Sequence, residues 1–186
     1  MNTTLKPGEE IGYTVTFLEM TERPTWPTPS LPVGQKSALV AASNPPVEYF
    51  LYLYSAVGAP HEWTDWLQKP REELEAFVGN PQVLLYTLMV DGWPGGFFVL
   101  DRTGSPATDL ANFGLVPEAI GRGLGRWLLA TAILTAWSDP ATERLTVNTN
   151  TLDHPRALGL YQRMGFQVVR QEDHRRILTR ERPIPG

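Results

Sequence analysis

The chain has 186 residues, of which 42% are hydrophobic and 19% are charged, and its formal net charge is −4 at pH 7. This composition is typical of a globular protein with one sizeable core and excludes an intrinsically disordered chain. The acidic balance, without clustered Lys and Arg, argues against a nucleic-acid surface, and the absence of cysteine excludes disulfides, thiol nucleophiles and thiolate metal sites.

The first third of the chain predicts one strand, a proline-rich loop and two helices. Residues 13–20 (YTVTFLEM) alternate as a strand does, whereas the prolines of residues 24–33 exclude a helix there. Asn44 and two prolines give a start signal for a helix over 47–58, although its aromatic and β-branched residues would also suit a strand. Residues 70–80 (PREELEAFVGN) predict a second, short helix with acids in its first turn.

The rest of the chain predicts a sheet with two more helices. The expected strands are 83–90, 97–102, 108–116, 144–150, 166–171 and 174–180, and the expected helices are 123–138 and 154–165. A turn, DGWPGG, joins the first two of these strands. This order predicts a mixed α/β (α+β) fold with helices on the faces of one sheet. We expect a single domain over 1–186, with a proline-rich loop at 24–33 and a short C-terminal tail at 181–186.

Three glycines stand between the strand 108–116 and the long helix, in the stretch Gly121-Arg122-Gly123-Leu124-Gly125. Glycines at a strand-to-helix junction leave backbone N–H groups and the positive end of the helix dipole uncovered, which favours an anion. A tight turn with no ligand is the simpler alternative. A P-loop would need Lys and Ser or Thr after the last glycine, where Arg126 and Trp127 stand, and a dinucleotide fingerprint would need an earlier βαβ unit.

The glycine stretch resembles the acetyl-CoA-binding loop of the GNAT superfamily of N-acetyltransferases. A second stretch, ALGLYQRMGF (157–166), is similar to that family's A-x-x-L-Y-x-x-x-G-F signature. The resemblance covers about 83–169 and reaches the N-terminal third only in outline. It implies a mostly antiparallel central sheet flanked by helices on both faces, with acetyl-CoA as co-substrate. Ile120 stands where the family usually has Gln or Arg, and His154 where it commonly has Asn.

The resemblance also implies which residues hold the cofactor. Backbone groups of the strand before the glycine loop should pair with the pantetheine arm, and the loop amides should hold the pyrophosphate. The implied cofactor-binding residues are Phe113, Leu115, Val116, Gly121, Arg122, Gly123, Leu124, Gly125, Arg126 and His154.

Acyl transfer to an amine requires a neutral nucleophile, a polarised carbonyl and a proton for the departing thiolate. Tyr161 stands where the family's tyrosine approaches the CoA sulfur, so a catalytic role as proton donor is implied; packing against the sheet is the alternative. Asp109 stands at a place that resembles the family's catalytic glutamate and is the candidate base. A strand-end acid beside Thr108 is an equal alternative.

The acceptor pocket is expected between residues 24 and 82, where Glu62, Trp63 and Asp65 could bind an amine by charge and by cation–π attraction. Aromatic residues that close an edge of the core are the alternative. The three histidines lack metal-ligand spacing, so we expect no metal.

We therefore expect an acetyl-CoA-dependent N-acetyltransferase that acts on a primary amine of a small molecule or peptide by direct attack in a ternary complex. The alternatives are a catalytically degenerate acyl-CoA-binding sensor and, less favoured, a nucleotide-binding domain. No stretch is typical of a signal peptide or a membrane span, so we expect a cytoplasmic protein without membrane or nucleic-acid partners. A homodimer is left open.

Overall fold

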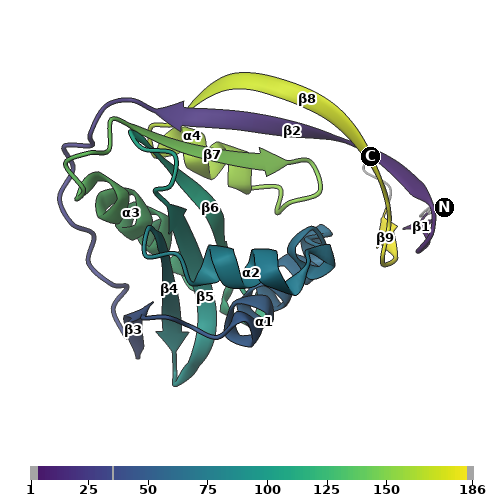
Figure 1. Cartoon of the computed structure of the whole chain (residues 1–186), viewed down its shortest axis with the longest axis horizontal. Coiled ribbons are helices and arrows are strands. Elements are labelled where there is room, and N and C mark those ends of the chain that lie inside the picture. Colours follow the sequence, from purple (N-terminus) through teal and green to yellow (C-terminus); the bar gives the residue numbers. More distant parts are fainter. Residues whose placement is uncertain (1–3, 35, 184–186) are drawn as a thin grey trace.

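The computed structural model describes residues 4–34 and 36–183 and contains a seven-stranded sheet in the order β3-β4-β5-β6-β7-β2-β8 (Figure 1). All neighbours are antiparallel except β6 and β7, so the predicted mixed, mostly antiparallel fold is confirmed. Its strands are β2 (Glu10–Met20), β3 (Ser37–Ala42), β4 (Val83–Val90), β5 (Trp93–Asp101), β6 (Ala107–Leu115), β7 (Arg144–Asn150) and β8 (Gln167–Ile177). A separate pair joins β1 (Thr4–Leu5) to β9 (Arg182–Pro183).

Helices cover both faces of this sheet. They are α1 (Val47–Gly58), α2 (Arg71–Val78), α3 (Leu124–Trp137) and α4 (Ala157–Arg163), with 3₁₀ turns η1 (Ala59–His61), η2 (Trp66–Gln68) and η3 (Pro117–Ala119). Along β5, Phe97 and Val99 pack into the core under α1 and α2, while Phe98 and Leu100 pack against α3 and α4. The continuous apolar run of β5 therefore reflects a strand that is buried on both faces.

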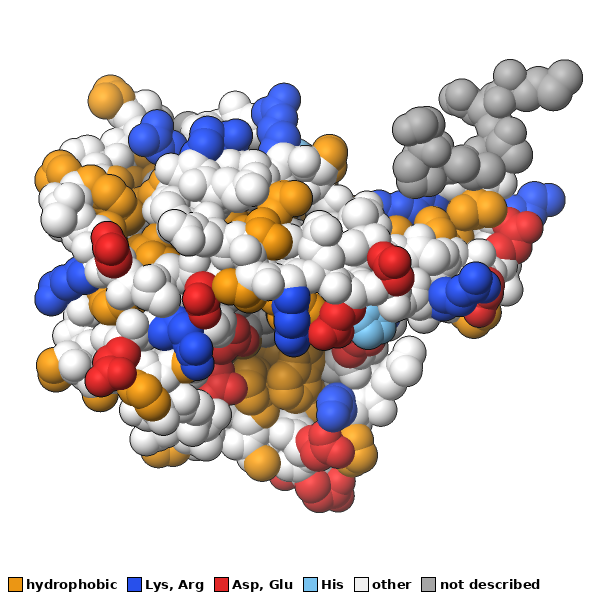
Figure 2. Space-filling view, turned by 90° about the horizontal axis from the view of Figure 1, so that it is seen from above, with side chains coloured by type: hydrophobic (Ala, Val, Ile, Leu, Met, Phe, Trp, Pro, Cys, Tyr) orange, Lys and Arg blue, Asp and Glu red, His pale blue; other side chains and the backbone are white. Residues whose placement is uncertain are grey.

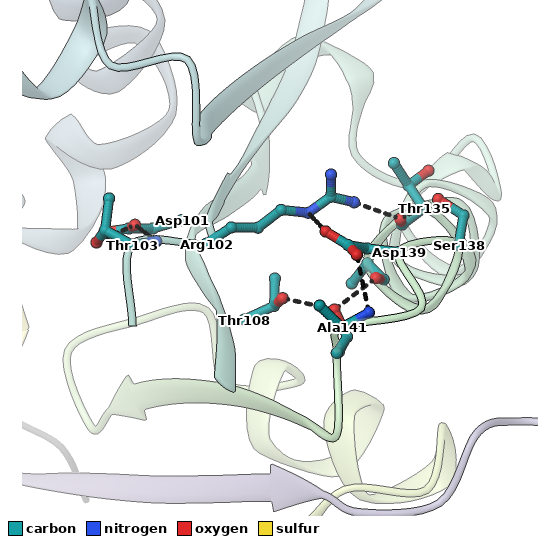
Figure 3. A network of polar contacts seen from close by, with 10 residues as sticks. Asp101, Arg102, Thr103, Thr108, Thr135, Ser138, Asp139 and Ala141 are labelled. Carbon is teal, nitrogen blue, oxygen red and sulfur yellow. Dashed lines mark hydrogen bonds and ion pairs between the residues drawn. The ribbon is translucent and has the colours of Figure 1, made fainter. Parts of the chain in front are cut away.

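The C-terminal end of α3 is fixed by a polar network at the edge of β5 and β6 (Figure 3). The Arg102 guanidinium donates to the carbonyl of Thr135 at 3.0 Å and lies 3.5 Å from the Asp139 carboxylate. Thr142 donates to the carbonyl of Ala136 at 3.0 Å. A cation and hydroxyl donors at the last carbonyls complement the negative end of the helix dipole. This network holds the C-terminal end of α3, whose N-terminal end follows the glycine loop.

The sheet opens between β6 and β7. The two strands pair only from Ala107 to Asp109, and the remainder of β6 has no partner on that side. A register shift against β5 leaves Ala111 without an opposite residue, which makes a β-bulge at the point where the strands diverge. Because bulges bend and twist a strand, this one directs the end of β6 away from β7.

Several elements differ from those predicted: the pair of β1 and β9 was not predicted, and β5 begins at Trp93 instead of at residue 97. β3 was not predicted. It pairs with β4 at the edge of the sheet and is half exposed. The predicted separate strands 166–171 and 174–180 are wrong, because β8 runs unbroken from Gln167 to Ile177 along β2. The helix expected from residue 154 begins at Ala157.

The proline-rich loop at 24–33 is irregular, as expected, and lies against α3, since Trp127 donates to the carbonyl of Pro29 at 3.1 Å. In the predicted C-terminal tail, Arg182–Pro183 form β9, and residues 184–186 lie outside the described residues. Within the described ranges, no helix is long and apolar enough to cross a membrane.

Candidate active site

A cavity of about 600 Å³ lies where β6 and β7 separate. Its wall combines the end of α1 and η1, the free side of β6, the glycine loop, the end of β7 and α4. Figure 2 shows a hollow on one face of the molecule, with hydrophobic side chains inside it and acidic and basic side chains along its rim. The cavity is large enough for a substrate of drug-like size.

The glycine loop forms one end of the cavity, through Gly121, Gly123 and Gly125. Gly121 and Gly123 have φ angles of 83° and 76°, a left-handed conformation that side chains rarely adopt. A Cβ at Gly121 would meet no atom within 4 Å, so packing inside the protein does not require this glycine; its open side is available to a ligand. Gly123 precedes α3 without a side-chain cap, which leaves the first N–H groups of that helix for an anion.

The other predicted loop residues divide between the cavity and the protein body. Arg126 lines the cavity. Leu124 is fully buried in the core under α3, so only its backbone can serve a ligand. Arg122 forms an ion pair with Asp91 at 2.8 Å. Ile120, which stands where the family usually has Gln or Arg, also lines the cavity.

Along the free edge of β6, the backbone N–H and C=O groups of successive residues point alternately toward β5 and into the opening. Val116 donates its N–H to the carbonyl of Gly95 at 3.0 Å, and the register with β5 continues without interruption to Asn112. In an antiparallel ladder, alternate residues point their N–H and C=O groups to the same partner strand. Gly114 and Asn112 therefore bond β5 as Val116 does, and Phe113 and Leu115 point their backbone groups into the opening. The N–H of Val116 is therefore already bonded within the sheet and does not face the opening.

Tyr161, on α4, lines the cavity and is only 5% exposed. Its ring packs edge-on against Phe113 and Phe166. Burial raises the pKa of its phenol far above the ordinary value, and the charges of Asp153 and Asp109 act in the same direction. The phenol is therefore protonated throughout the range in which the protein would work.

Asp109 is not brought into the cavity. It lies on β6 at the last residue that pairs with β7, and its carboxylate accepts a hydrogen bond from Thr146 at 2.6 Å. Burial raises its pKa, the Thr146 hydrogen bond lowers it, and the charge of Asp101 raises it. Among the described residues, those that line the cavity begin one position later on β6, at Leu110.

Of the three predicted acceptor residues, two line the cavity and one does not. Trp63 lines the cavity and donates its indole N–H to Asp153 at 2.9 Å. Asp65 lines it too, and pairs with Arg176 at 2.9 Å. Glu62 does not line the cavity: it is 1% exposed, and its carboxylate accepts hydrogen bonds from the backbone N–H and the hydroxyl of Thr179 at 3.0 and 2.8 Å. Its role here is to join η1 to the segment after β8.

Several polar residues of the cavity wall were not singled out from the sequence as site residues, among them His61, Asp153 and Arg176. Asp153 accepts hydrogen bonds from Trp63, from the hydroxyl of Thr149 and from the N–H of Asn150. Its position after the predicted strand 144–150 was a usable signal, because strand ends commonly carry site residues. The predicted His154 lines the cavity next to it, and its Nδ1 accepts from the N–H of Arg156 at 3.2 Å.

Comparison with known proteins places this geometry in context. Residues 83–168 match the family model described as acetyltransferase (GNAT) domain. No curated protein matches the chain significantly.

The chain is similar in fold to many solved structures. One is a GCN5-related N-acetyltransferase from Kribbella flavida (TM-score 0.57, 18% identity, covering 94% of this chain and 61% of that one). Another is a tandem GNAT protein from the clavulanic acid biosynthesis pathway (TM-score 0.62, 16% identity, 92% and 54%). A third is an aminoglycoside acetyltransferase from an uncultured soil metagenomic sample, in complex with trehalose (TM-score 0.54, 14% identity, 68% and 86%). The chain thus spans less than two thirds of the length of the first two.

Proposed function

We propose that this chain, whose residues 83–168 match a GNAT acetyltransferase domain and include the glycine loop and the 157–166 motif, is an N-acetyltransferase that moves the acetyl group of acetyl-CoA to a primary amine. The acceptor is an amine of a small molecule or a peptide, and it attacks the thioester directly while both substrates are bound. The observation that carries this proposal is the open edge of β6, which lies over a cavity with the glycine loop at one end and the buried phenol of Tyr161 in its wall.

The residues present fit acetyl-CoA. The left-handed glycines leave space beside the start of α3, where a pyrophosphate would accept hydrogen bonds from backbone N–H groups. Arg126 adds a positive charge at that end. The outward N–H and C=O groups of Phe113 and Leu115 would bond the amides of a pantetheine arm as an additional strand does.

The chemistry follows from the remaining groups. An outward N–H of β6 would stabilise negative charge on the thioester oxygen, as in an oxyanion hole. Tyr161 would donate its proton to the thiolate as the carbon–sulfur bond breaks. We do not assign the base role to Asp109, because its carboxylate is bonded to Thr146 outside the cavity. His154 would contact the cofactor arm near α4.

The continuous sheet supports the further proposal that residues 1–186 form a single domain. A homodimer and a cytoplasmic location stay predictions.

The first test compares ligands by thermal denaturation. Acetyl-CoA at 100 times its Kd should stabilise the native state by about 2.7 kcal/mol, a rise in Tm of roughly 5–10 °C for a chain of this length. ATP and NAD at equal concentration should raise Tm much less. Gly123→Asp should abolish the acetyl-CoA shift, because it adds bulk and negative charge at the start of α3.

Gly8→Asp is the matched control, since Gly8 also has a positive φ, of 91°, with no atom near its Cβ position, and it lies outside the cavity lining. It should keep the full shift. An ATP shift as large as that of acetyl-CoA would overturn the cofactor assignment. Turnover is then measured with a panel of amines that includes polyamines, amino acids, peptide N-termini and an aminoglycoside; acetyl-CoA binding without turnover on any amine would favour the sensor alternative.

A further inference from the structure

Acetylation of an amine requires a group that takes a proton from the acceptor. Alkyl amines are mainly ammonium ions at neutral pH and cannot attack a carbonyl until they lose a proton. Asp109 and Glu62 are both bonded away from the cavity, and Tyr161 holds its own proton. The group that removes the proton must lie in the cavity wall and carry a free lone pair. This inference rests on the proposed function.

His61 has both properties. It lines the cavity from η1, and its Nδ1 lies 3.3 Å from the carbonyl oxygen of Leu152. A carbonyl oxygen only accepts hydrogen bonds, so this contact favours the neutral tautomer that carries its proton on Nδ1. Nε2 then carries the lone pair, and it has no hydrogen-bond partner among the residues that the structure describes.

The ring is held in this position by its surroundings. Arg182 donates to the carbonyl of Leu152 at 2.7 Å and to that of Pro60 at 3.4 Å, so one guanidinium holds both the residue before His61 and the acceptor of its Nδ1. The next residue, Glu62, is fixed through Thr179. A base that does not need to reorganise keeps its reach to a bound substrate.

The burial and the charged groups around the ring determine its pKa, and so the pH above which it carries no second proton. Burial lowers the pKa of His61, and the positive or ionisable groups His154 and Arg182 lower it further. Asp153 and the Leu152 carbonyl act in the opposite direction, and the net direction is downward. The imidazole is therefore neutral at pH 7, as a proton acceptor must be.

We propose that His61, through Nε2, is the catalytic base that takes one proton from the acceptor ammonium. The freed amine nitrogen then bonds to the acetyl carbon, and the carbon–sulfur bond breaks with its electron pair on sulfur. Tyr161 protonates that sulfur and recovers a proton from the new amide nitrogen. His61 releases its proton to solvent, so the sum is one amide, one thiol and one proton.

The tautomer can be tested without knowing the acceptor. The chain has three histidines, so the ring nitrogens of the ¹⁵N-labelled protein give a simple NMR spectrum, and His61→Asn identifies the signals of His61 by their loss. We expect a protonated Nδ1, an unprotonated Nε2 and a pKa below the ordinary value of about 6.5. A proton on Nε2 in the neutral ring would overturn the proposal.

The kinetic test uses the same variant. Asn places an amide N–H where Nδ1 stands and can still donate to Leu152, but it removes the basic nitrogen. We expect kcat to fall roughly 10²–10⁴-fold, with an unchanged acetyl-CoA Tm shift. In the wild type, kcat/KM should fall as pH drops through the lowered pKa, and His61→Asn should lose that limb. His174→Asn is the control, because His174 lies exposed on β8 beside Glu172.

The outcomes separate the two proposals. Turnover by His61→Asn within threefold of the wild type would overturn the role of His61 and leave the acetyltransferase standing. A wild type that binds acetyl-CoA but acetylates no amine in the panel would overturn both.

Discussion

Three carboxylates near the cavity show how the same chemical group acquires different roles. Glu62 is buried on Thr179 and joins two segments, and Asp109 is bonded to Thr146 at the closed end of the β6–β7 opening. Asp153 lies in the cavity wall, as Asp65 does, and accepts the indole N–H of Trp63. The partners that the fold supplies, rather than the type of residue, decide which acid faces a substrate.

At the residue scale, Tyr161→Phe tests the proposed proton donor. The variant keeps the ring contacts with Phe113 and Phe166 but loses the phenolic proton, so kcat should fall roughly 10²-fold or more. The Kd of acetyl-CoA should change little. Because the phenol pKa is raised, its proton is retained as pH rises, so the wild-type kcat should show no alkaline loss from this group up to pH 10. Equal turnover in both proteins would reduce Tyr161 to a packing residue.

The sequence predicts part of this site because part of it is local. The glycine loop and Tyr161 belong to short motifs in which the backbone turn or the helix position is set within a few residues. His61 could not be predicted in the same way, since the carbonyl that fixes its tautomer is 91 residues away along the chain. The position of Glu62 outside the cavity could not be predicted for the same reason, because its partner Thr179 is 117 residues away.

At the element scale, the end of α1 supports the side of the cavity that we propose for the acceptor. Gly58 is the last residue of α1, and its carbonyl accepts the N–H of Trp63 at 3.1 Å. The Trp63 ring lies over this glycine so closely that a Cβ at Gly58 would be 2.3–2.4 Å from its atoms. The glycine therefore allows the indole to reach Asp153.

Gly58→Ala tests this contact. Alanine normally favours a helix over glycine by about 1 kcal/mol, but here its methyl group displaces Trp63. We expect the free energy of unfolding to fall by about 1–3 kcal/mol and KM for the amine to rise, while the acetyl-CoA Kd stays close to that of the wild type. Gly12→Ala is the control, because a Cβ there would meet its nearest atom at 3.9 Å. A variant as stable as Gly12→Ala would contradict the expected clash.

The elements themselves were predictable where periodicity is strong. The strand 144–150 was predicted with its observed bounds, and α1 was predicted despite its strand-forming residues. β8 was divided in two because its polar middle, Gln171-Glu172-Asp173, interrupts the alternation. In the structure these residues are paired with β2, and that pairing overrides their weak strand propensity.

At the scale of the whole molecule, the cavity has two ends with different origins. The glycine loop, β6 and α4 all lie within residues 83–168, which match the family model. The acceptor end comes from α1 and η1 on one side and from residues after 168 on the other, through Arg176, Thr179 and Arg182. The family motifs therefore predict the proposed cofactor end, and the proposed acceptor end depends on contacts of residues 60–65 with residues 176–182.

Because β6 beyond Asp109 is paired on one side only, the hydrogen-exchange rates of its amides should differ between alternate residues. In ligand-free protein, the amide protons of Phe113 and Leu115 should exchange with deuterium faster than those of Asn112, Gly114 and Val116, which bond to β5. Acetyl-CoA should slow exchange selectively at Phe113 and Leu115 and erase this odd–even pattern. Residue-resolved hydrogen exchange would reveal it; equal protection of neighbouring amides in the free protein would mean that β6 is closed by something other than a ligand.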